Sequence, residues 1–209
     1  MSKFVWILDA GHGGVIDGEY VTSGKRSPIW SDGTQYFEGV GNRNIVKKLI
    51  SKLEEKNIEY FDLMEGSQED ISLHNRAYKC NNIYHNDKRA VLISMHSNGF
   101  TQESANGFSI YTSRGETKSD LFASLFIKNM ELHFPKHKSR KDYTDGDSDK
   151  EADFYVLKKT NCPAILIENF FMTNFRESKL LMSKDFQNRI VDCHFQSICE
   201  IENSETFIF

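Results

Sequence analysis

Short apolar runs alternate along the chain with longer segments whose apolar residues recur at helical spacing. Residues 4–8 form the first run, which stops at a glycine-rich turn and therefore predicts a strand. Residues 90–95 form an apolar run of the kind seen in strands that are buried on both faces. A similar run at residues 164–167 ends at Glu168. The pattern predicts further strands at residues 58–63, 107–112 and 154–157.

Helical spacing begins at Glu38. The residues Ile45, Leu49 and Leu53 recur near one helical face, while lysines occupy the other face. The same reasoning predicts helices at residues 71–84, at residues 118–134 and from residue 175 to about residue 202. Two segments remain, a Gly-, Ser-, Thr- and Asp-rich one at 15–37 and a densely charged one at 136–153. We interpret both as surface loops, and long loops in compact domains are usually functional.

The alternation of strands and helices predicts an α/β fold with a mainly parallel sheet. A chain of 209 residues is typical of one domain, so we expect residues 1–209 to form a single catalytic domain with its own core. No internal repeat is visible in the sequence.

Composition and charge exclude several classes of partner. The net charge of −4 gives no dominant basic patch, so we expect no binding to nucleic acid. The apolar start of the chain is too short for a signal peptide or a membrane helix. We therefore expect no export by a leader of its own and no membrane insertion.

The four cysteines form no C-x-x-C pair and suit buried free thiols of a chain made in a reducing compartment. We expect a monomer.

Three polar residues stand where predicted strands end. His12 follows the first strand, His96 follows the strand at 90–95, and Glu168 follows the strand at 164–167. Because sites in open α/β sheets lie at the carboxyl ends of strands, these side chains should meet in one crevice, which Glu38 can also reach. Two histidines and a carboxylate form a known catalytic zinc set. A metal-bound water is acidic near pH 7, and Glu168 would move its proton, so the pattern predicts a metallohydrolase.

Each of these residues also has a structural explanation. His96 has the pattern of a buried structural histidine, and the two glutamates suit the first turn of a helix. Asp17 and Glu19 follow His12 closely and compete with Glu38 for the role of third ligand. The other histidines lie in helical or charged stretches, where a solvated or structural role is favoured: His74, His85, His133, His137 and His194.

Three motifs resemble those of a known enzyme family. Residues 8–14, Leu-Asp-Ala-Gly-His-Gly-Gly, resemble the opening signature of the zinc amidases of the Amidase_3 family, which commonly has proline in place of Ala10. Residues 93–98, Ile-Ser-Met-His-Ser-Asn, resemble the second histidine motif of that family. Residues 166–174 resemble its catalytic glutamate motif, with Asn169 where small residues are common.

The segment from Glu38 to Asn42 resembles the metal-binding glutamate of the same family, and the order and spacing of all four motifs match over nearly the whole chain. The resemblance implies that His12, Glu38 and His96 bind one Zn²⁺ per chain and that Glu168 is the catalytic acid/base. It implies a twisted mixed sheet with helices on both faces. It also implies a peptidoglycan hydrolase that cleaves the amide between N-acetylmuramic acid and L-alanine.

Two other functions would use the same fold. A zinc-dependent deacylase of a different small amide would share the site chemistry. A wall-binding module would be expected to lose a ligand or Glu168, and this chain keeps all four residues.

The segment 136–153 lacks the apolar periodicity of the helix that blocks zinc in some relatives, which favours an open site. Arg76 and Asn98 occupy positions that resemble those of the family, which implies either support of the site or a structural role for each. The setting is the bacterial cell wall, reached by a released phage lysin or by a bacterial enzyme whose leader has been removed.

Overall fold

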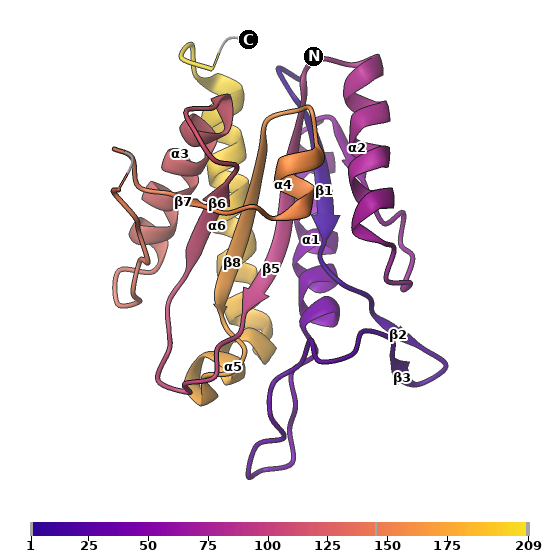
Figure 1. The fold of residues 1–209 in the computed structure, drawn as a ribbon, viewed down its shortest axis with the longest axis vertical. Coiled ribbons are helices and arrows are strands. Elements are labelled where there is room, and N and C mark those ends of the chain that lie inside the picture. The colour runs from indigo at the N-terminus through magenta and orange to yellow at the C-terminus, as the bar shows by residue number, and fades with distance from the viewer. Residues whose placement is uncertain (1, 145, 208–209) are drawn as a thin grey trace.

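The computed structural model describes residues 2–144 and 146–207. In this part of the chain, six strands form one sheet in the order β4-β1-β5-β8-β6-β7 (Figure 1). Their bounds are Val5–Ala10 for β1, Tyr60–Asp62 for β4, Ala90–Asn98 for β5, Ser109–Thr112 for β6, Lys150–Glu151 for β7 and Ala164–Phe171 for β8. Neighbouring strands are parallel except for the antiparallel pair β6 and β8. The prediction of an α/β fold with a mostly parallel, mixed sheet is confirmed.

Helices cover both faces of the sheet (Figure 1). One face carries α1 (Glu38–Glu55), α3 (Lys118–His133) and α6 (Lys184–Asn203). The other face carries α2 (Leu73–Asn86) and α4 (Tyr155–Lys159). A short helix, α5 (Phe175–Met182), connects β8 to α6. Among the described residues, no helix is both long enough and apolar enough to cross a membrane.

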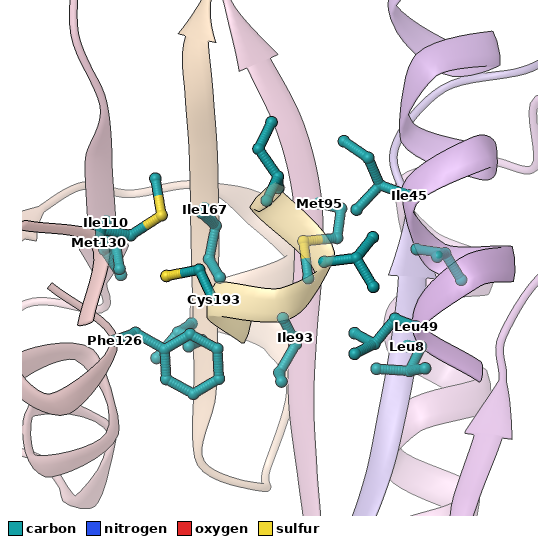
Figure 2. Packing of buried hydrophobic residues seen from close by; sticks show 14 of the residues in the cluster. Leu8, Ile45, Leu49, Ile93, Met95, Ile110, Phe126, Met130, Ile167 and Cys193 are labelled. Atoms are coloured by element: carbon teal, nitrogen blue, oxygen red, sulfur yellow. The ribbon is translucent and has the colours of Figure 1, made fainter. Parts of the chain in front are cut away.

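The apolar strands β1, β5 and β8 are buried on both faces, as their sequences predict. Successive side chains of a strand point to opposite faces. Leu8 and Ile93 therefore pack with Ile45 and Leu49 of α1 in the larger cluster (Figure 2), while Ile7 packs in the second cluster with α2 and α4. The carboxyl ends of β1 and β5 point to the end of the molecule that carries the long loop of residues 15–37 (Figure 1).

The prediction of a strand at residues 154–157 is wrong, because this segment forms the start of the helix α4. The neighbouring residues Val156 and Leu157 are both buried in the second cluster, whereas a strand would send them to opposite faces. The carbonyl of Phe154 accepts hydrogen bonds from the backbone N–H groups of Leu157 (3.0 Å) and Lys158 (2.9 Å). A helical turn thus satisfies both packing and backbone hydrogen bonding.

The predicted closing helix is divided at Ser183, where the backbone is extended between α5 and α6. The loop at 15–37 contains a small hairpin of β2 (Val15–Ile16) and β3 (Glu19–Tyr20). The charged segment at 136–153 contains β7, and its residue 145 lies outside the described residues. All four cysteines are free thiols.

Candidate metal and catalytic site

Glycines at the end of β1 bring the first histidine close to the second. His12 adopts a φ of 67°, in the left-handed region that non-glycine residues rarely occupy. A Cβ atom added at Gly11 would lie 2.2 Å from Cε1 of His96, so glycine is required for the histidine rings to approach. Their centroids lie 4.9 Å apart at an interplanar angle of 89°. A Cβ added at Gly39 would likewise lie 1.8 Å from the carbonyl oxygen of Gly13, which packs the turn against the start of α1.

Glu38 is the first residue of α1 and is only 2% exposed. Its Oε1 lies 3.2 Å from Nε2 of His12 and 3.1 Å from Nδ1 of His96. The backbone N–H of Ser97 also donates to this oxygen, over 3.2 Å. Nε2 of His12 is buried and has no hydrogen-bond partner, because its contact with Glu38 lacks hydrogen-bond geometry. The two atoms are therefore placed as two ligands of one metal ion would be.

The three converging side chains fit a divalent metal ion. One ligand atom from each of His12, Glu38 and His96 lies within 4.8 Å of the other two. Two imidazole nitrogens and a carboxylate oxygen form a donor set found in catalytic zinc sites. Burial raises the pKa of Glu38, but the two imidazoles outweigh burial and hold that pKa below its ordinary range. Metal ligands must be deprotonated, and the carboxylate meets this condition.

Asp17 and Glu19, the alternative third ligands, are exposed in the β2–β3 hairpin and do not belong to this group. Asp17 and Gly18 occupy the hairpin turn with φ angles of 51° and 84°. Two positive φ angles are typical of the Asp-Gly turn that fits the twist of a hairpin. This dipeptide signal was present in the sequence, and it accounts for the exposure of both acids.

Glu168 and His96 lie inside strands, although we expected them to follow strands. β5 and β8 continue past their apolar runs, and the two residues are direct partners in the parallel ladder. The side chain of Glu168 is partly exposed, but its Oε2 is buried without a hydrogen-bond partner. Burial raises the pKa of Glu168 to about 7, against the opposing effect of His96. A carboxyl with a pKa near neutrality can both accept and donate a proton.

All four predicted residues line one groove of about 620 Å³. Its other lining residues come from the loop before α1, from the ends of β5 and β8, and from the first turns of α2 and α4. They include Lys25, Arg26, Asn98, Phe100, Phe154, Tyr155 and Met172. The structure thus brings His12, Glu38, His96 and Glu168 together at the carboxyl end of the sheet.

Arg76 supports the turn that carries His12. This buried side chain of α2 forms an ion pair with the buried carboxylate of Asp9. It also donates hydrogen bonds to the carbonyl oxygens of Ala10 (3.0 Å) and His12 (3.2 Å). The hydroxyl of Ser94 donates to the second oxygen of Asp9 over 2.7 Å. A buried ion pair therefore fixes the backbone on both sides of Gly11.

Two further residues of α1 hold the same turn, and the sequence analysis missed them. Nδ2 of Asn42 donates to the carbonyl oxygen of Gly11 over 3.1 Å. Nη1 of Arg43 donates to the carbonyl oxygen of His12 over 2.7 Å. The available signal was helical spacing, since Asn42 lies four residues after Glu38 and so shares its face of the helix.

Asn169, the residue that departs from the common motif, connects α6 to the strand that carries His96. Its Nδ2 donates to the carbonyl oxygen of His96 over 3.3 Å, and its Oδ1 accepts from Nε2 of His194 over 2.9 Å. Both side chains are fully buried. Burial lowers the pKa of His194 to about 3. As the pH falls, the imidazole of His194 therefore takes up a proton in the unfolded chain before it does so in the folded chain. The contribution of the neutral imidazole to the free energy of unfolding is present above about pH 6.5 and is lost as the pH falls towards 3.

Replacing Asn169 with alanine is expected to lower the free energy of unfolding by about 1–3 kcal/mol, because it leaves the buried donor of His194 without an acceptor. Urea unfolding would measure this change. Asn82→Ala is the matched control, since Asn82 is exposed on α2 and surface changes usually stay within about 0.5 kcal/mol. Equal effects of the two substitutions would contradict the structural role of this network.

Comparisons with known proteins place the fold and the site in context. The Amidase_3 family model, described as N-acetylmuramoyl-L-alanine amidase, matches residues 7–200. The endolysin of Bacillus phage SPP1 is 30% identical over 208 residues, which cover 97% of this chain and 67% of that protein. The N-acetylmuramoyl-L-alanine amidase of Clostridium difficile 630 is 25% identical, with 98% of this chain and 100% of that one covered and a TM-score of 0.78.

A second solved structure gives a similar result. The catalytic domain of CwlV, an N-acetylmuramoyl-L-alanine amidase from Bacillus (Paenibacillus) polymyxa var. colistinus, is 25% identical to this chain. The match covers 94% of this chain and 97% of that domain, with a TM-score of 0.72.

Proposed function

The chain belongs to the Amidase_3 family of N-acetylmuramoyl-L-alanine amidases, and on this premise we propose that it cleaves the amide between N-acetylmuramic acid and L-alanine of peptidoglycan by a zinc-dependent mechanism. Family membership makes it a peptidoglycan amidase that acts on the bacterial cell wall. The observation that carries the finer proposal is the convergence of His12, Glu38 and His96 beside the carboxyl of Glu168 in one groove.

We assign the metal ligands to His12, Glu38 and His96, with one zinc ion per chain. The unpartnered Nε2 of His12 and the ionised carboxylate of Glu38 support this assignment. A zinc ion bound there would make a water molecule acidic near neutral pH and would polarise the scissile carbonyl. The imidazoles and the carboxylate hold their positions because glycines, Arg76 and α1 fix the backbone around them.

Glu168 is the proposed general acid and base. Its carboxylate would accept a proton from the attacking water and then deliver it to the nitrogen of the departing amine. Amide cleavage needs this second transfer, because an amide anion is a very poor leaving group. A pKa of about 7 suits both transfers near neutral pH, since neither protonation state is then rare. The buried Oε2 without a partner leaves the carboxyl available for the reaction.

We extend the proposal to the organisation of the chain. The two hydrophobic clusters lie on opposite faces of one sheet, which supports a single catalytic domain over residues 1–209. We expect this domain to act as a monomer, which size-exclusion chromatography with light scattering would test.

Digestion of purified peptidoglycan is expected to release free stem peptides that begin with L-alanine and to leave the glycan strands intact. Mass spectrometry of the soluble products would identify the new amino terminus, and a reducing-sugar assay would report on the glycan. The Glu168→Gln variant serves as the control for contaminating hydrolases. New reducing ends, or cuts between amino acids of the stem, would contradict the proposed bond.

A further inference from the structure

Three aspartates gather outside the catalytic groove. Asp120 lies in the first turn of α3, and Asp147 and Asp149 lie in the segment before β7. One carboxylate oxygen from each lies within 4.8 Å of the other two. None of the three lines the groove that contains His12. The topology therefore brings together carboxylates that are up to 29 residues apart in the sequence.

Asp149 has a buried oxygen that nothing in the described part of the chain satisfies. The residue is only 2% exposed. Its Oδ2 accepts a hydrogen bond from the hydroxyl of Thr112 over 2.6 Å, whereas its Oδ1 is buried and has no hydrogen-bond partner. An unpartnered buried acceptor bears the full cost of losing its water, so a cation bound at this oxygen would be stabilising.

The ion pairs found between described residues give the cluster no side-chain counter-charge. None of the ion pairs between described residues involves one of these carboxylates. Burial raises the pKa of Asp149 to about 7, and the neighbouring Asp147 and Asp120 raise it further. Burial and Asp147 also raise the pKa of Asp120. Three carboxylates in mutual repulsion, one of them buried, form a site that a cation would stabilise.

Asp120 has a structural role as well, which is compatible with binding a cation. It completes the capping box of α3, where its oxygens accept from the backbone N–H (2.6 Å) and the hydroxyl (2.8 Å) of Thr117. A carboxylate has about four lone-pair positions, so two hydrogen bonds leave capacity for a metal ion. The capping box accounts for the position of Asp120, but it provides no hydrogen-bond partner for the buried Oδ1 of Asp149.

We propose that Asp120, Asp147 and Asp149 bind a calcium ion. The donors are all oxygens, which favours a hard cation over zinc. Calcium accepts irregular sites with several carboxylates and waters, whereas magnesium demands a near-ideal octahedron. The ion would tie the segment before β7 to α3 and, through Thr112, to β6. Because the chain continues from β7 into Phe154 and Tyr155, calcium would steady one wall of the groove.

Calcium titration of the zinc-supplied protein would test the proposal. In calcium-free buffer, addition of CaCl₂ to 10 mM is expected to raise the melting temperature by about 3–6 °C, as for a site of roughly millimolar affinity. Calorimetry should show one calcium per chain. Asp149→Asn and Asp147→Asn should abolish both the rise and the heat, and Asp142→Asn, a change in the same segment but outside the cluster, should keep them. MgCl₂ should produce less than half of the rise.

Two further comparisons separate this site from the zinc site and from misfolding. Without calcium, Asp149→Asn should melt no lower than the unchanged protein, because it removes a buried repelling charge. Glu38→Gln should retain the full calcium response, since Glu38 lies outside the aspartate cluster. The proposal is overturned if calcium changes neither heat nor melting temperature, if both aspartate variants respond normally, or if Glu38→Gln loses the response. An equal rise with MgCl₂ would overturn the choice of calcium.

Discussion

Replacing Glu168 with glutamine is expected to lower turnover of peptidoglycan by about 10²–10⁴-fold, the usual contribution of general acid–base catalysis. Glutamine keeps the size of the side chain but can neither accept the proton of the water nor deliver it to the amine. The metal should stay, because Glu168 is not one of the three converging ligands. The free energy of unfolding should change little, since the carboxyl, with a pKa of about 7, is about half protonated at pH 7 and its Oε2 has no hydrogen bond to lose.

Turnover, metal content and melting temperature should be measured on one preparation of each variant. Glu177→Gln is a matched control, because burial also raises the pKa of Glu177 to about 7. Glu177 accepts hydrogen bonds from the backbone N–H groups of Gly107 and Phe171, both over 2.8 Å, so an amide nitrogen there would face a donor. We expect this control to lose stability but to keep its turnover per folded molecule. A near-normal rate of Glu168→Gln with full metal would leave Glu168 with a structural role only.

The convergence of the site was predictable from the sequence because polar residues interrupt apolar runs at one end of the sheet. Parallel strands share the edge at which they end, so His12, His96 and Glu168 had to lie near one another once their strands were adjacent. The exact ends of the strands were not predictable. The backbone ladder between β5 and β8 continues through His96 and Glu168, where the apolar pattern has stopped, because hydrogen bonding does not depend on side-chain polarity.

Other features depend on tertiary contacts that no local pattern reports. The hydrogen bond between Asn169 and His194 joins a strand to a helix, and neither residue by itself indicates the other. The helix α4 forms because Val156 and Leu157 must face the same cluster, a demand set by the sheet and α2. The third ligand was ambiguous for a related reason. Asp17 lies outside the site because it occupies the exposed turn of the β2–β3 hairpin.

Removal of any one of the three converging ligands is expected to reduce bound zinc from about one ion per chain to near zero, and to abolish turnover with it. A catalytic zinc site commonly has three protein ligands, so the loss of one leaves only two to compete with water. The expected result holds for His12→Ala, His96→Ala and Glu38→Ala. Elemental analysis of purified variants would measure the metal, and addition of excess zinc before the turnover assay would show whether activity returns.

The variants Asp17→Ala and Glu19→Ala are the controls. Because both acids are exposed in the hairpin, their replacement should leave the zinc content and the turnover unchanged. The choice of Glu38 rests on its buried carboxylate, which lies 3.2 Å from His12 and 3.1 Å from His96. If Glu38→Ala alone retained the metal, the third ligand would have to be sought among Asp17, Glu19 and Glu168. Retention of one zinc per chain after all three residues become alanine would place the metal elsewhere and remove the basis for a zinc-dependent reaction in this groove.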